Sequence, residues 1–466
     1  MKKLLAMVLA LVMTLSLAVS ASAFKDDKDI SADYAEAAAV LDGMGVFEGV
    51  DGSFLPKDNI TRAQVATIIY RVATADTAGY GKDKSGLYAT YNKFSDMTGA
   101  GWASGYIGYA ANAEYVKGYP DGTFKPSGNV TGYEVLAMIL RVVGYDKNNE
   151  FSGADWALNV AKYAESLGIL DNVDKSTDLS APASRELVAE LLFQAIQKDM
   201  VTYTPAFGYV TDKVADLKQT SIGYKNFKLA SDDSEDVWGR PTTVWFEDSD
   251  KDLKYDDGTE DTYAEITATP KATFNVETSQ CDICEALGVK KTTTVVDTYT
   301  NGKLETADVT YTATATKSMV GAQGQQLEYY KVDGGYRLGV IDTYLAKVAD
   351  VVAEKLDSKG HVIRDDYMEL TCYKTADKNE TIYVAGNDYA EDDYVLVNVN
   401  EKATDKIIGE GTVKHVEVVG KAESFEGAQS KNWYNAAKHT IDDKDYNDAV
   451  RFYLDAAGTT KTAKFT

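Results

Sequence analysis

The sequence predicts a multidomain α+β protein, in which an all-helical part precedes mainly antiparallel β modules. Two observations support this fold class. Apolar residues recur with helical spacing from about residue 24 to about residue 204, and they alternate with polar residues in much of the chain after it. The chain has 466 residues, which is too long for one compact core, so several domains are expected.

The first 23 residues form a segment of their own. Lys2 and Lys3 precede an almost wholly apolar run from Leu4 to Val19, and the small residues Ala21-Ser22-Ala23 follow. This order is typical of a secretory signal peptide, and the run is too short for a membrane anchor. We therefore expect residues 1–23 to be removed and the mature chain to be secreted, without a membrane span.

Three helical units are expected next, at residues 24–85, 90–148 and 149–204. Each has an Ala-rich amphipathic helix, a corner rich in Gly, Pro or Asp, and a second helix opened by a capping residue. Such a unit cannot bury its apolar face alone, so the three are expected to pack together. The predicted capping residues are Thr61, Thr131 and Ser184.

Two β-rich modules are expected after the helical units, at residues 205–350 and 351–466. Asn301-Gly302 lies between two alternating runs, which is the strongest short signal for a hairpin, and Asp333-Gly334-Gly335 repeats it. The stretch LAKVADVVAEKL, residues 345–356, fits either a helix or a strand followed by a short connector.

The composition is strongly acidic, with a formal net charge of −24 and a sequence pI of about 4.6. Nucleic acids and anionic membrane surfaces need a basic footprint on the protein, so neither is an expected partner. The charge instead fits a solvated extracellular surface.

The chain has three cysteines, Cys281, Cys284 and Cys372, too few for a disulfide scaffold of this length. The first two form a CDIC stretch, which is compatible with a redox or metal site. We favour the alternative, in which it is the buried face of a short helix capped by Ser279 and ended by Gly288.

No catalytic motif emerges from the sequence. It contains no Gly-x-Ser-x-Gly elbow, no His-Glu-x-x-His helix and no phosphate-binding glycine loop. His415 alternates with Glu417 along a predicted strand, which indicates a solvated face. We expect no enzymatic activity, although 72 acidic residues leave a glycosidase-type carboxylate pair open for the C-terminal region.

An acidic stretch, EDSDKDLKYDDGTED, resembles a calcium-binding loop. Asp248, Asp250 and Asp252 occupy alternate positions, as calcium ligands do. Leu253 stands where such a loop needs glycine, and Thr259 stands where it needs a bidentate acid. We therefore favour an acidic hairpin tip over a calcium site, and expect no other cofactor.

Four segments of the helical units carry a resemblance to a known family. They resemble the S-layer homology (SLH) domain, which usually occurs in threes. The resemblance covers roughly residues 24–200, is highly specific in the second unit, clear in the first and degenerate in the third. The segments are Ile60–Gln64 (ITRAQ), Phe94-Ser95-Asp96, Trp102-Ala103 and Gly118–Pro126 (GYPDGTFKP).

The resemblance implies a pseudo-threefold helical bundle with ligand grooves between neighbouring repeats. It also implies non-covalent binding of a secondary cell-wall polysaccharide, often one bearing pyruvylated sugars. The chain is further similar, through Trp238-Gly239-Arg240-Pro241, to SLH-bearing surface proteins of clostridial bacteria.

Arg62 is the leading candidate ligand residue. It follows the Thr61 cap, where a cation opposes the helix dipole at a cost of about 0.3–1 kcal/mol unless an anion is near. Free backbone N–H groups and a guanidinium would together bind a carboxylate such as a pyruvyl ketal. Position alone favours a solvated arginine or a local salt bridge, and the resemblance reverses that preference. Arg185 occupies the same position after Ser184.

The second unit has Gly132 in this position, so we expect its groove to be weakened or altered in specificity. Gln64 and Glu134 have the spacing of capping-box residues and are included among the candidate ligand contacts. Trp102 fits stacking on a sugar face and helix packing equally well. Asp121 and Gly122 are further candidates, although turn formation explains them better.

The predicted function is therefore that of a secreted surface-layer protein. Its SLH repeats would hold it on an anionic secondary polysaccharide of the cell wall, and it would self-associate in a surface lattice. The alternative is an SLH-anchored extracellular enzyme or carbohydrate-binding protein that acts on polysaccharide through its β-rich region.

Overall fold

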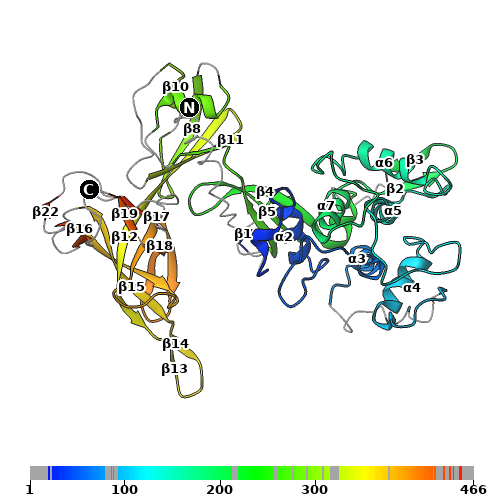
Figure 1. Cartoon of the computed structure of the whole chain (residues 1–466), viewed down its shortest axis with the longest axis horizontal. Helices are drawn as coiled ribbons and strands as arrows, with labels where there is room; N and C mark the ends of the chain where they lie inside the picture. Colours follow the sequence, from blue (N-terminus) through cyan, green and yellow to red (C-terminus); the bar gives the residue numbers. More distant parts are fainter. Residues whose placement is uncertain are drawn as a thin grey trace. The chain divides into compact units, whose positions relative to one another are not determined.

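The structure is a computed structural model of the chain (Figure 1). The predicted signal peptide lies outside its described residues except for Val19–Ser20, and so does Thr259 of the acidic stretch. The described ranges are 24–78, 93–211, 219–255, 260–274, 278–289, 292–306, 309–314, 325–375 and 378–422, with residues 86 and 88 and short strands at 19–20, 424–426, 434–435, 440–441, 444–445 and 451–453.

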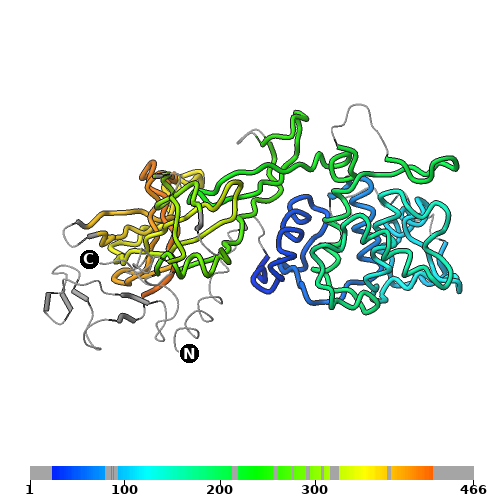
Figure 2. The backbone as a smooth tube through the Cα atoms, turned by 90° about the horizontal axis from the view of Figure 1, so that it is seen from above, coloured from blue at the N-terminus to red at the C-terminus, as the bar shows by residue number. Residues whose placement is uncertain are grey.

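Eight α-helices and several antiparallel sheets occur in these ranges, so the mixed α+β class is confirmed. The chain forms two compact units. One, here called the helical body, comprises Ala18–Asp233 and Thr243–Ile266. The other, here called the β body, includes Ser234–Thr242 and Thr267–Thr466. Figure 2 shows the helices in blue to green and the β body in green to orange.

Each helical unit of the helical body contributes two main helices. The first helix of every unit packs against the second helix of another: α4 on α3, α6 on α5, and α2 on α7. The three units therefore contact one another in a closed cycle. Their bounds are α2 (Ala35–Gly43), α3 (Arg62–Thr74), α4 (Ser104–Asn112), α5 (Gly132–Val143), α6 (Trp156–Ser166) and α7 (Arg185–Ile196).

The predicted caps open all three second helices. The hydroxyls of Thr61 and Thr131 accept hydrogen bonds from the backbone of the third helical residue, and both form complete capping boxes. Ser184 caps α7 in the same way, but Leu187 stands in the position of the reciprocal side chain. Each box satisfies backbone donors that the first helical turn would otherwise leave unpaired.

The residues that precede these helices join in a ring of three backbone hydrogen bonds. Ile60 N donates to Ala183 O (3.1 Å), Ala183 N to Val130 O (2.8 Å), and Val130 N to Ile60 O (3.2 Å). All three side chains are buried. The corner that precedes each helix is thus tied to its counterparts in the other two units.

Several smaller elements complete the helical body. In the four-stranded sheet β1-β6-β5-β4, strand β5 packs through Trp245 on the helices: its indole nitrogen donates to Glu36 of α2 (2.8 Å), and its ring contacts Phe193 of α7. The smaller elements are β1 (Val19–Ser20), η1 (Asp27–Asp29), η2 (Ala32–Tyr34), η4 (Gly101–Ala103), β2 (Val201–Thr204), β3 (Gly208–Thr211), α8 (Ile222–Phe227), β4 (Leu229–Glu235), β5 (Pro241–Glu247) and β6 (Thr262–Thr267).

The β body begins with a sheet in the order β10-β8-β12-β11-β7. Both predicted hairpins are confirmed: Asn301-Gly302 joins β8 to β9, and Asp333-Gly334 joins β11 to β12. Asn301 and Gly302 have φ values of 49° and 80°, the left-handed geometry of a tight hairpin turn. The bounds are β7 (Ala272–Phe274), α9 (Gln280–Ala286), β8 (Thr292–Thr300), β9 (Lys303–Thr306), β10 (Val309–Thr312), β11 (Gln325–Val332) and β12 (Gly335–Val352).

Strand β12 continues into a second ladder, in which it pairs with β15 and β17. The ambiguous stretch 345–356 is thus a strand with a short connector. Within the ladder, β15 pairs with β16 and β17 with β18. Lys414 of β18 and Glu380 of β16 form an ion pair (2.7 Å), so the two outer strands meet. The bounds are β13 (Lys355–Leu356), β14 (Val362–Arg364), β15 (Tyr367–Thr375), β16 (Lys378–Ala385), β17 (Tyr394–Ile407) and β18 (Gly411–Lys421).

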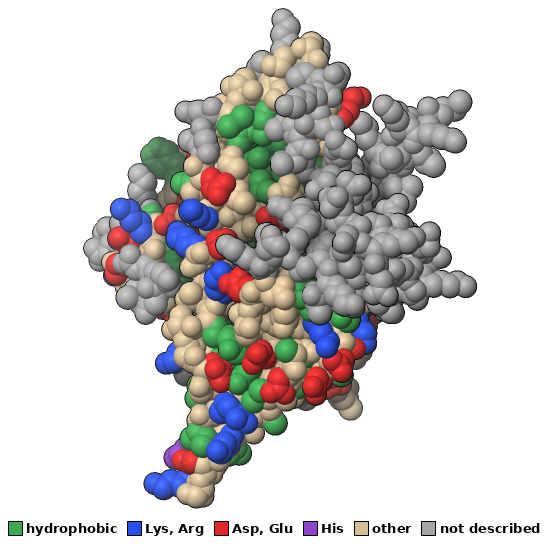
Figure 3. All heavy atoms as spheres, turned by 90° about the vertical axis from the view of Figure 1, so that its left-hand side faces the viewer, with side chains coloured by type: hydrophobic (Ala, Val, Ile, Leu, Met, Phe, Trp, Pro, Cys, Tyr) green, Lys and Arg blue, Asp and Glu red, His purple; other side chains and the backbone are tan. Residues whose placement is uncertain are grey.

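Figure 3 shows one face of the β body, where acidic, basic and apolar side chains intermingle and acidic ones gather in its lower part. The remaining strands pair as β19 with β23 and as β20-β21-β22. Their bounds are β19 (Ser424–Glu426), β20 (Tyr434–Asn435), β21 (Thr440–Ile441), β22 (Lys444–Asp445) and β23 (Arg451–Tyr453).

Candidate functional site

Arg62 leaves the start of α3 and enters the corner of the second unit. Its Nε donates to Phe124 O (2.8 Å), its Nη2 donates to Lys117 O (3.1 Å), and its Nη1 pairs with Glu134 (3.0 Å). The guanidinium also lies 4.7 Å from the ring centre of Tyr119. Arg62 is 3% exposed, and burial lowers its pKa. Every guanidinium nitrogen is therefore bonded inside the protein.

Arg185 makes the corresponding contact between α7 and the corner of the first unit. Its Nε donates to Phe54 O (2.6 Å) and its Nη2 to Glu48 O (2.9 Å), while the guanidinium lies 4.9 Å from the ring centre of Phe47. The difference from Arg62 is at Nη1, for which the described residues supply no hydrogen-bond acceptor.

Gly132 faces the corner of the third unit, and Leu179 fills the space beside it. A β-carbon at Gly132 would lie 2.8 Å from Leu179 Cδ2 and 3.1 Å from Leu179 O. Tyr133 N donates to Leu179 O (3.0 Å), which holds this backbone in place. The missing arginine of the second unit therefore corresponds to a close backbone approach.

The N–H groups of the first helical turns are already bonded, which corrects the sequence argument that they remain free for an anion. In α3, Arg62 N donates to Gly128 O (2.9 Å) and Ala63 N to Pro126 O (3.0 Å). In α7, Arg185 N donates to Asp58 O (2.9 Å) in the same manner. An anion must therefore be bound by side chains.

A groove of about 90 Å³, here called the repeat-1 groove, lies beside Arg185. Its polar lining includes Glu48, Gln64, Thr67, Arg71 and Arg185, over an apolar floor of Phe47 and Ile68. The carboxylate of Glu48 pairs with Nη2 of Arg71 (3.0 Å). The charges of its lining side chains therefore sum to one positive charge.

Three residues that line this groove, Gln64, Arg71 and Arg185, have donor atoms without a described acceptor. Arg71 is 3% exposed, and its Nε is buried without a hydrogen-bond partner in the described structure. The side-chain oxygen of Gln64 accepts from Thr61 N (2.9 Å), while no described residue bonds its amide nitrogen. With Nη1 of Arg185, these groups suit a carboxylate or sugar hydroxyls.

The other predicted ligand residues lie in the second unit. Glu134 is the N3 residue of its capping box and also accepts from the hydroxyl of Tyr119 (2.7 Å). Asp121 accepts from Thr123 N (3.0 Å), and Gly122 has φ +82°, so both form the turn. Trp102 of η4 is 43% exposed. The structure does not bring Trp102, Asp121 or Gly122 into the repeat-1 groove.

Three acidic side chains of the stretch that resembles a calcium-binding loop converge. Carboxylate oxygens of Asp248, Asp250 and Glu260 lie within 4.8 Å of one another. Asp248 is buried and accepts from the hydroxyl of Tyr224 (2.6 Å) and from Asp252 N (3.0 Å). These bonds already stabilise the carboxylate as part of a turn, as the hairpin interpretation expects.

The CDIC stretch forms α9, with Ser279 as its cap. Ile283 and Cys284 are fully buried and pack with Leu287 in a core that includes Tyr311. The buried-face interpretation of this stretch is therefore confirmed.

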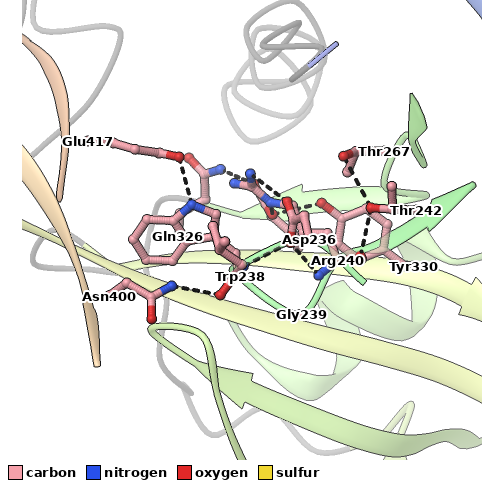
Figure 4. A network of polar contacts seen from close by, with 12 residues as sticks. Asp236, Trp238, Gly239, Arg240, Thr242, Thr267, Gln326, Tyr330, Asn400 and Glu417 are labelled. Carbon is pink, nitrogen blue, oxygen red and sulfur yellow. Dashed lines mark hydrogen bonds and ion pairs between the residues drawn. The ribbon is translucent and has the colours of Figure 1, made fainter. Parts of the chain in front are cut away.

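The Trp238-Gly239-Arg240-Pro241 turn is held in a polar network of the β body (Figure 4). Asp236 accepts from the backbone of Trp238 and Arg240, and Arg240 Nε pairs with Glu328 of β11 (2.8 Å). The Trp238 indole donates to Glu417 of β18 (2.7 Å). Side chains therefore fix this turn to two strands far away in sequence.

The predicted solvated face at His415 is only partly solvated, because Trp238 and acidic neighbours cover part of the ring and leave its side chain 24% exposed. Its ring lies edge-on to Trp238, with centroids 6.0 Å apart. Asp405 is 3.1 Å from Nδ1, and Glu417 is 3.6 Å from Nε2. Glu417, followed by Asp405, raises the pKa of His415 to about 9.

Comparison with known families explains the repeated corners. A family model, S-layer homology domain, matches residues 23–66 and 93–136. These two segments are thus S-layer homology (SLH) domains. Both matched segments contain a Gly-rich corner and the start of the following helix, α3 in the first SLH repeat and α5 in the second.

Relatives of this SLH protein are wall and surface proteins of other bacteria. It is 25% identical over 305 residues to the middle cell wall protein of Brevibacillus brevis, covering 54% of this chain and 28% of that protein. It is 25% identical over 313 residues to the surface layer protein of Brevibacillus choshinensis, covering 56% and 27%. A cellulosome-anchoring protein of Acetivibrio thermocellus is 36% identical over 123 residues, 26% of each chain.

The chain thus spans about a quarter of the length of these relatives. The SLH domains and these relatives identify it as a secreted protein of the cell wall and cell surface. In the part of the chain that the structure describes, no helix is long and apolar enough to cross a membrane.

Sequence reasoning missed two residues of the first SLH repeat, Arg71 and Glu48. The sequence did contain a signal for Arg71. Arg71 and Arg141 are each the tenth residue of their helix, and in both helices the charged residue interrupts a mainly apolar stretch. Glu48 has Lys117 as its counterpart, so this position carries opposite charges in the two repeats. Only the folded corner shows that Glu48 and Arg71 meet.

Proposed function

We propose that the SLH region anchors this protein non-covalently to the cell wall by binding an anionic, pyruvylated secondary polysaccharide. The repeat-1 groove is the proposed primary site. Arg185 and Arg71 would bind the carboxylate of the acidic sugar, and Gln64 would donate to a neighbouring hydroxyl or to the same carboxylate.

The unpartnered Nε of Arg71 is the observation that carries this proposal. A buried N–H without an acceptor costs about 1–3 kcal/mol, so a ligand oxygen that reached Arg71 Nε on binding would remove this cost. A guanidinium binds a carboxylate through two parallel hydrogen bonds, which favours an acidic sugar over a neutral one.

We further propose that residues 24–85, 90–148 and 149–204 are three SLH repeats around a pseudo-threefold axis. The ring formed by Ile60, Val130 and Ala183 supports this arrangement, as does the closed cycle of contacts among the three units. The third repeat is the degenerate one, in which Leu179 meets Gly132.

The remaining predicted residues are assigned to the second repeat. We propose that Arg62 and Glu134 shape the wall of a second groove, since each already bonds the other. The exposed Trp102, Asp121 and Gly122 are proposed as outer sugar contacts. The contacts of this groove would differ from those of the repeat-1 groove, where Gln64 replaces Glu134.

For the β-rich modules at 205–350 and 351–466 we propose a surface-layer role, with self-association outside the wall. The relatives with the widest coverage are named as a cell wall protein and a surface layer protein, which supports a structural role. A net charge of −24 keeps such a chain hydrated and opposes non-specific binding to anionic polymers.

A sedimentation assay on purified cell walls tests the anchor. We expect the mature chain to bind walls and Arg71→Gln to lower its affinity at least tenfold, because the groove loses a charged donor. Lys175→Gln removes a positive charge from an exposed site outside the groove and is the matched control.

Two wall preparations separate the ligand classes. Walls stripped of secondary polysaccharide should lose binding, and walls stripped of ketal pyruvate alone should lose most of it. Equal binding of Arg71→Gln, with an unchanged thermal melt, would refute the assignment of the groove. Equal binding to walls without polysaccharide would refute the ligand class.

A further inference from the structure

A second cavity of the helical body, of about 160 Å³, lies at the end of α5. We call it the α5-end cavity. It is lined by polar and charged side chains, among them Glu114, Lys117, Arg141, Asp146, Lys147 and Asn149. The repeat-1 groove shares none of these residues, although Lys117 and Arg141 are the sequence counterparts of Glu48 and Arg71.

Asp146 is the internal counter-ion of this cavity. Its Oδ2 accepts from Arg141 Nε (2.7 Å) and Lys117 Nζ (2.9 Å), and its Oδ1 accepts from Phe151 N (2.7 Å). Asp146 is 7% exposed, and these bonds lower the pKa of its carboxyl despite its burial. The carboxylate is thus saturated, and it holds both cations in place.

Arg141 presents two unused donors. The residue is 9% exposed, and no described residue accepts a hydrogen bond from Nη1 or Nη2. Since Nε is fixed on Asp146, the plane of the guanidinium is fixed as well. A planar pair of N–H donors held at a buried site suits an oxygen anion.

The balance of charge favours an anion. Arg141, Lys117 and Lys147 contribute three positive charges, and Asp146 and Glu114 contribute two negative ones. Lys147 is exposed at the rim, and its side chain has no ion-pair partner in the described structure. Asp146 neutralises one cation only, so a site with net positive charge remains in a chain whose net charge is −24.

From these contacts we propose that the α5-end cavity binds a small oxyanion group, a carboxylate or a phosphate. Arg141 binds two of its oxygens, and Lys117 and Lys147 neutralise the charge that remains. This site does not depend on the proposed repeat-1 groove. It lies in the second unit and uses Lys117 and Arg141, the counterparts of Glu48 and Arg71 in the first unit. The anion is either free in solution or part of a polymer.

Calorimetric titration of the mature chain with inorganic phosphate and with pyruvate tests the site. An Arg71→Gln background removes one of the two guanidinium groups of the repeat-1 groove and so weakens that site, and sodium chloride at equal ionic strength corrects for screening. We expect saturable binding of at least one probe, weakened at least tenfold by Lys147→Glu. Lys175→Glu makes the same charge change at another exposed site and should leave the affinity unchanged.

Two further variants test the cavity from other sides. Arg141→Gln should abolish binding, but it also breaks a buried ion pair and could impair folding. The conclusion therefore depends on Lys147→Glu, which changes an exposed residue at the rim. Glu114→Gln removes the carboxylate that competes with the ligand and should tighten binding severalfold. No saturable binding, or equal affinities for wild type and Lys147→Glu, would overturn the proposal.

Wall sedimentation of Lys147→Glu identifies the source of the anion. Weaker wall binding, together with a weaker titration, assigns the anion to the wall polymer. Unchanged wall binding with a weaker titration assigns it to a free anion. Because the titration needs no wall, this site can be established even if the proposed anchor function fails.

Discussion

Leu179 packs directly against Gly132 at the interface between the second and third helical units. Each of the other two interfaces between units contains a buried arginine, Arg62 or Arg185. Arg62 and Arg185 each bond backbone carbonyls of a neighbouring corner, whereas Tyr133 N bonds the carbonyl of Leu179. The third interface is therefore closed by apolar contact and a close backbone approach. Gly132 therefore does more than remove the positive charge of an arginine, because close packing against Leu179 also requires a glycine at this position.

Gly132→Ala should destabilise the helical body by about 1–3 kcal/mol, since its new methyl group would overlap Leu179. The clash should outweigh the better helix propensity of Ala, worth about 1 kcal/mol. Urea unfolding followed by helical circular dichroism measures the effect. Gly101→Ala, where no atom lies within 4 Å of the added carbon, should change stability far less.

Adding Leu179→Ala to Gly132→Ala should recover part of the loss, because Leu179 Cδ2 is the nearest atom. The backbone oxygen at 3.1 Å keeps the recovery incomplete. A Gly132→Ala protein as stable as the wild type would show that this interface is not closely packed.

The effect of Asp42 of α2 on the pH dependence of stability gives a second prediction. Burial, followed by the charges of Asp27 and Glu48, raises its pKa to about 6. The folded state then binds a proton more tightly than the unfolded state, so this residue lowers stability as pH rises from about 4 to about 6. Asp42 is only half-buried, so the loss should be about 1 kcal/mol.

Asp42→Asn should therefore raise the free energy of unfolding at pH 7 by about 1 kcal/mol and leave it nearly unchanged at pH 3.5. Urea titrations at the two pH values measure this difference. A variant that shifts stability equally at both values would exclude the raised pKa as the cause.

Local signals in the sequence predicted the helix starts and the hairpins well. Thr61, Thr131 and Asn301-Gly302 act within a few residues of themselves, so neighbouring sequence is sufficient to predict them. The likeness of the corners further indicated that the units pack on one another.

Contacts between distant segments were not predictable in this way. Arg62 was expected to face an external anion, yet Phe124 O, Lys117 O and Glu134 bond it, and all are more than 50 residues away. His415 was expected to face solvent, and Trp238 covers part of its ring from far upstream. Period and spacing report which face is polar, but not which segment covers that face.

The Arg240–Glu328 pair should be essential for the β body. Both side chains are buried, and Arg240 also lies 3.5 Å from Asp236. Arg240→Leu would leave two acidic groups without their cation, at an expected cost of about 3–5 kcal/mol. Hydrogen exchange of β11 amides measures the loss of local stability.

Arg337→Leu is the matched control for Arg240→Leu, because its partners Glu235 and Asp297 are substantially more exposed. We expect it to cost about 1 kcal/mol. The double variant Arg240→Leu with Glu328→Leu should regain much of the loss, since it leaves fewer unpaired charges. Equal costs for the two single variants would contradict a special role for the buried pair.

His415 should stabilise the β body at neutral pH and lose this effect in alkali. Its folded pKa of about 9 exceeds the ordinary value of 6.5, because Glu417 and Asp405 favour the charged ring. A raised pKa of a basic group gives stability that is fully present below about pH 6.5 and lost as pH rises through 9. At about 1.4 kcal/mol per pKa unit, the contribution at pH 7 is about 2 kcal/mol.

His415→Gln should therefore lower stability at pH 6 and pH 7 but have little effect at pH 10, where the wild-type ring is neutral. Denaturant unfolding at the three pH values gives the profile, and an NMR titration of the His415 ring gives the pKa directly. His361→Gln makes the same substitution at an exposed site beside Asp357 and is the control, which should change stability far less. A ring that titrates near 6.5 would contradict the charged contact with Glu417, and the Trp238 turn would then rest on hydrogen bonds alone.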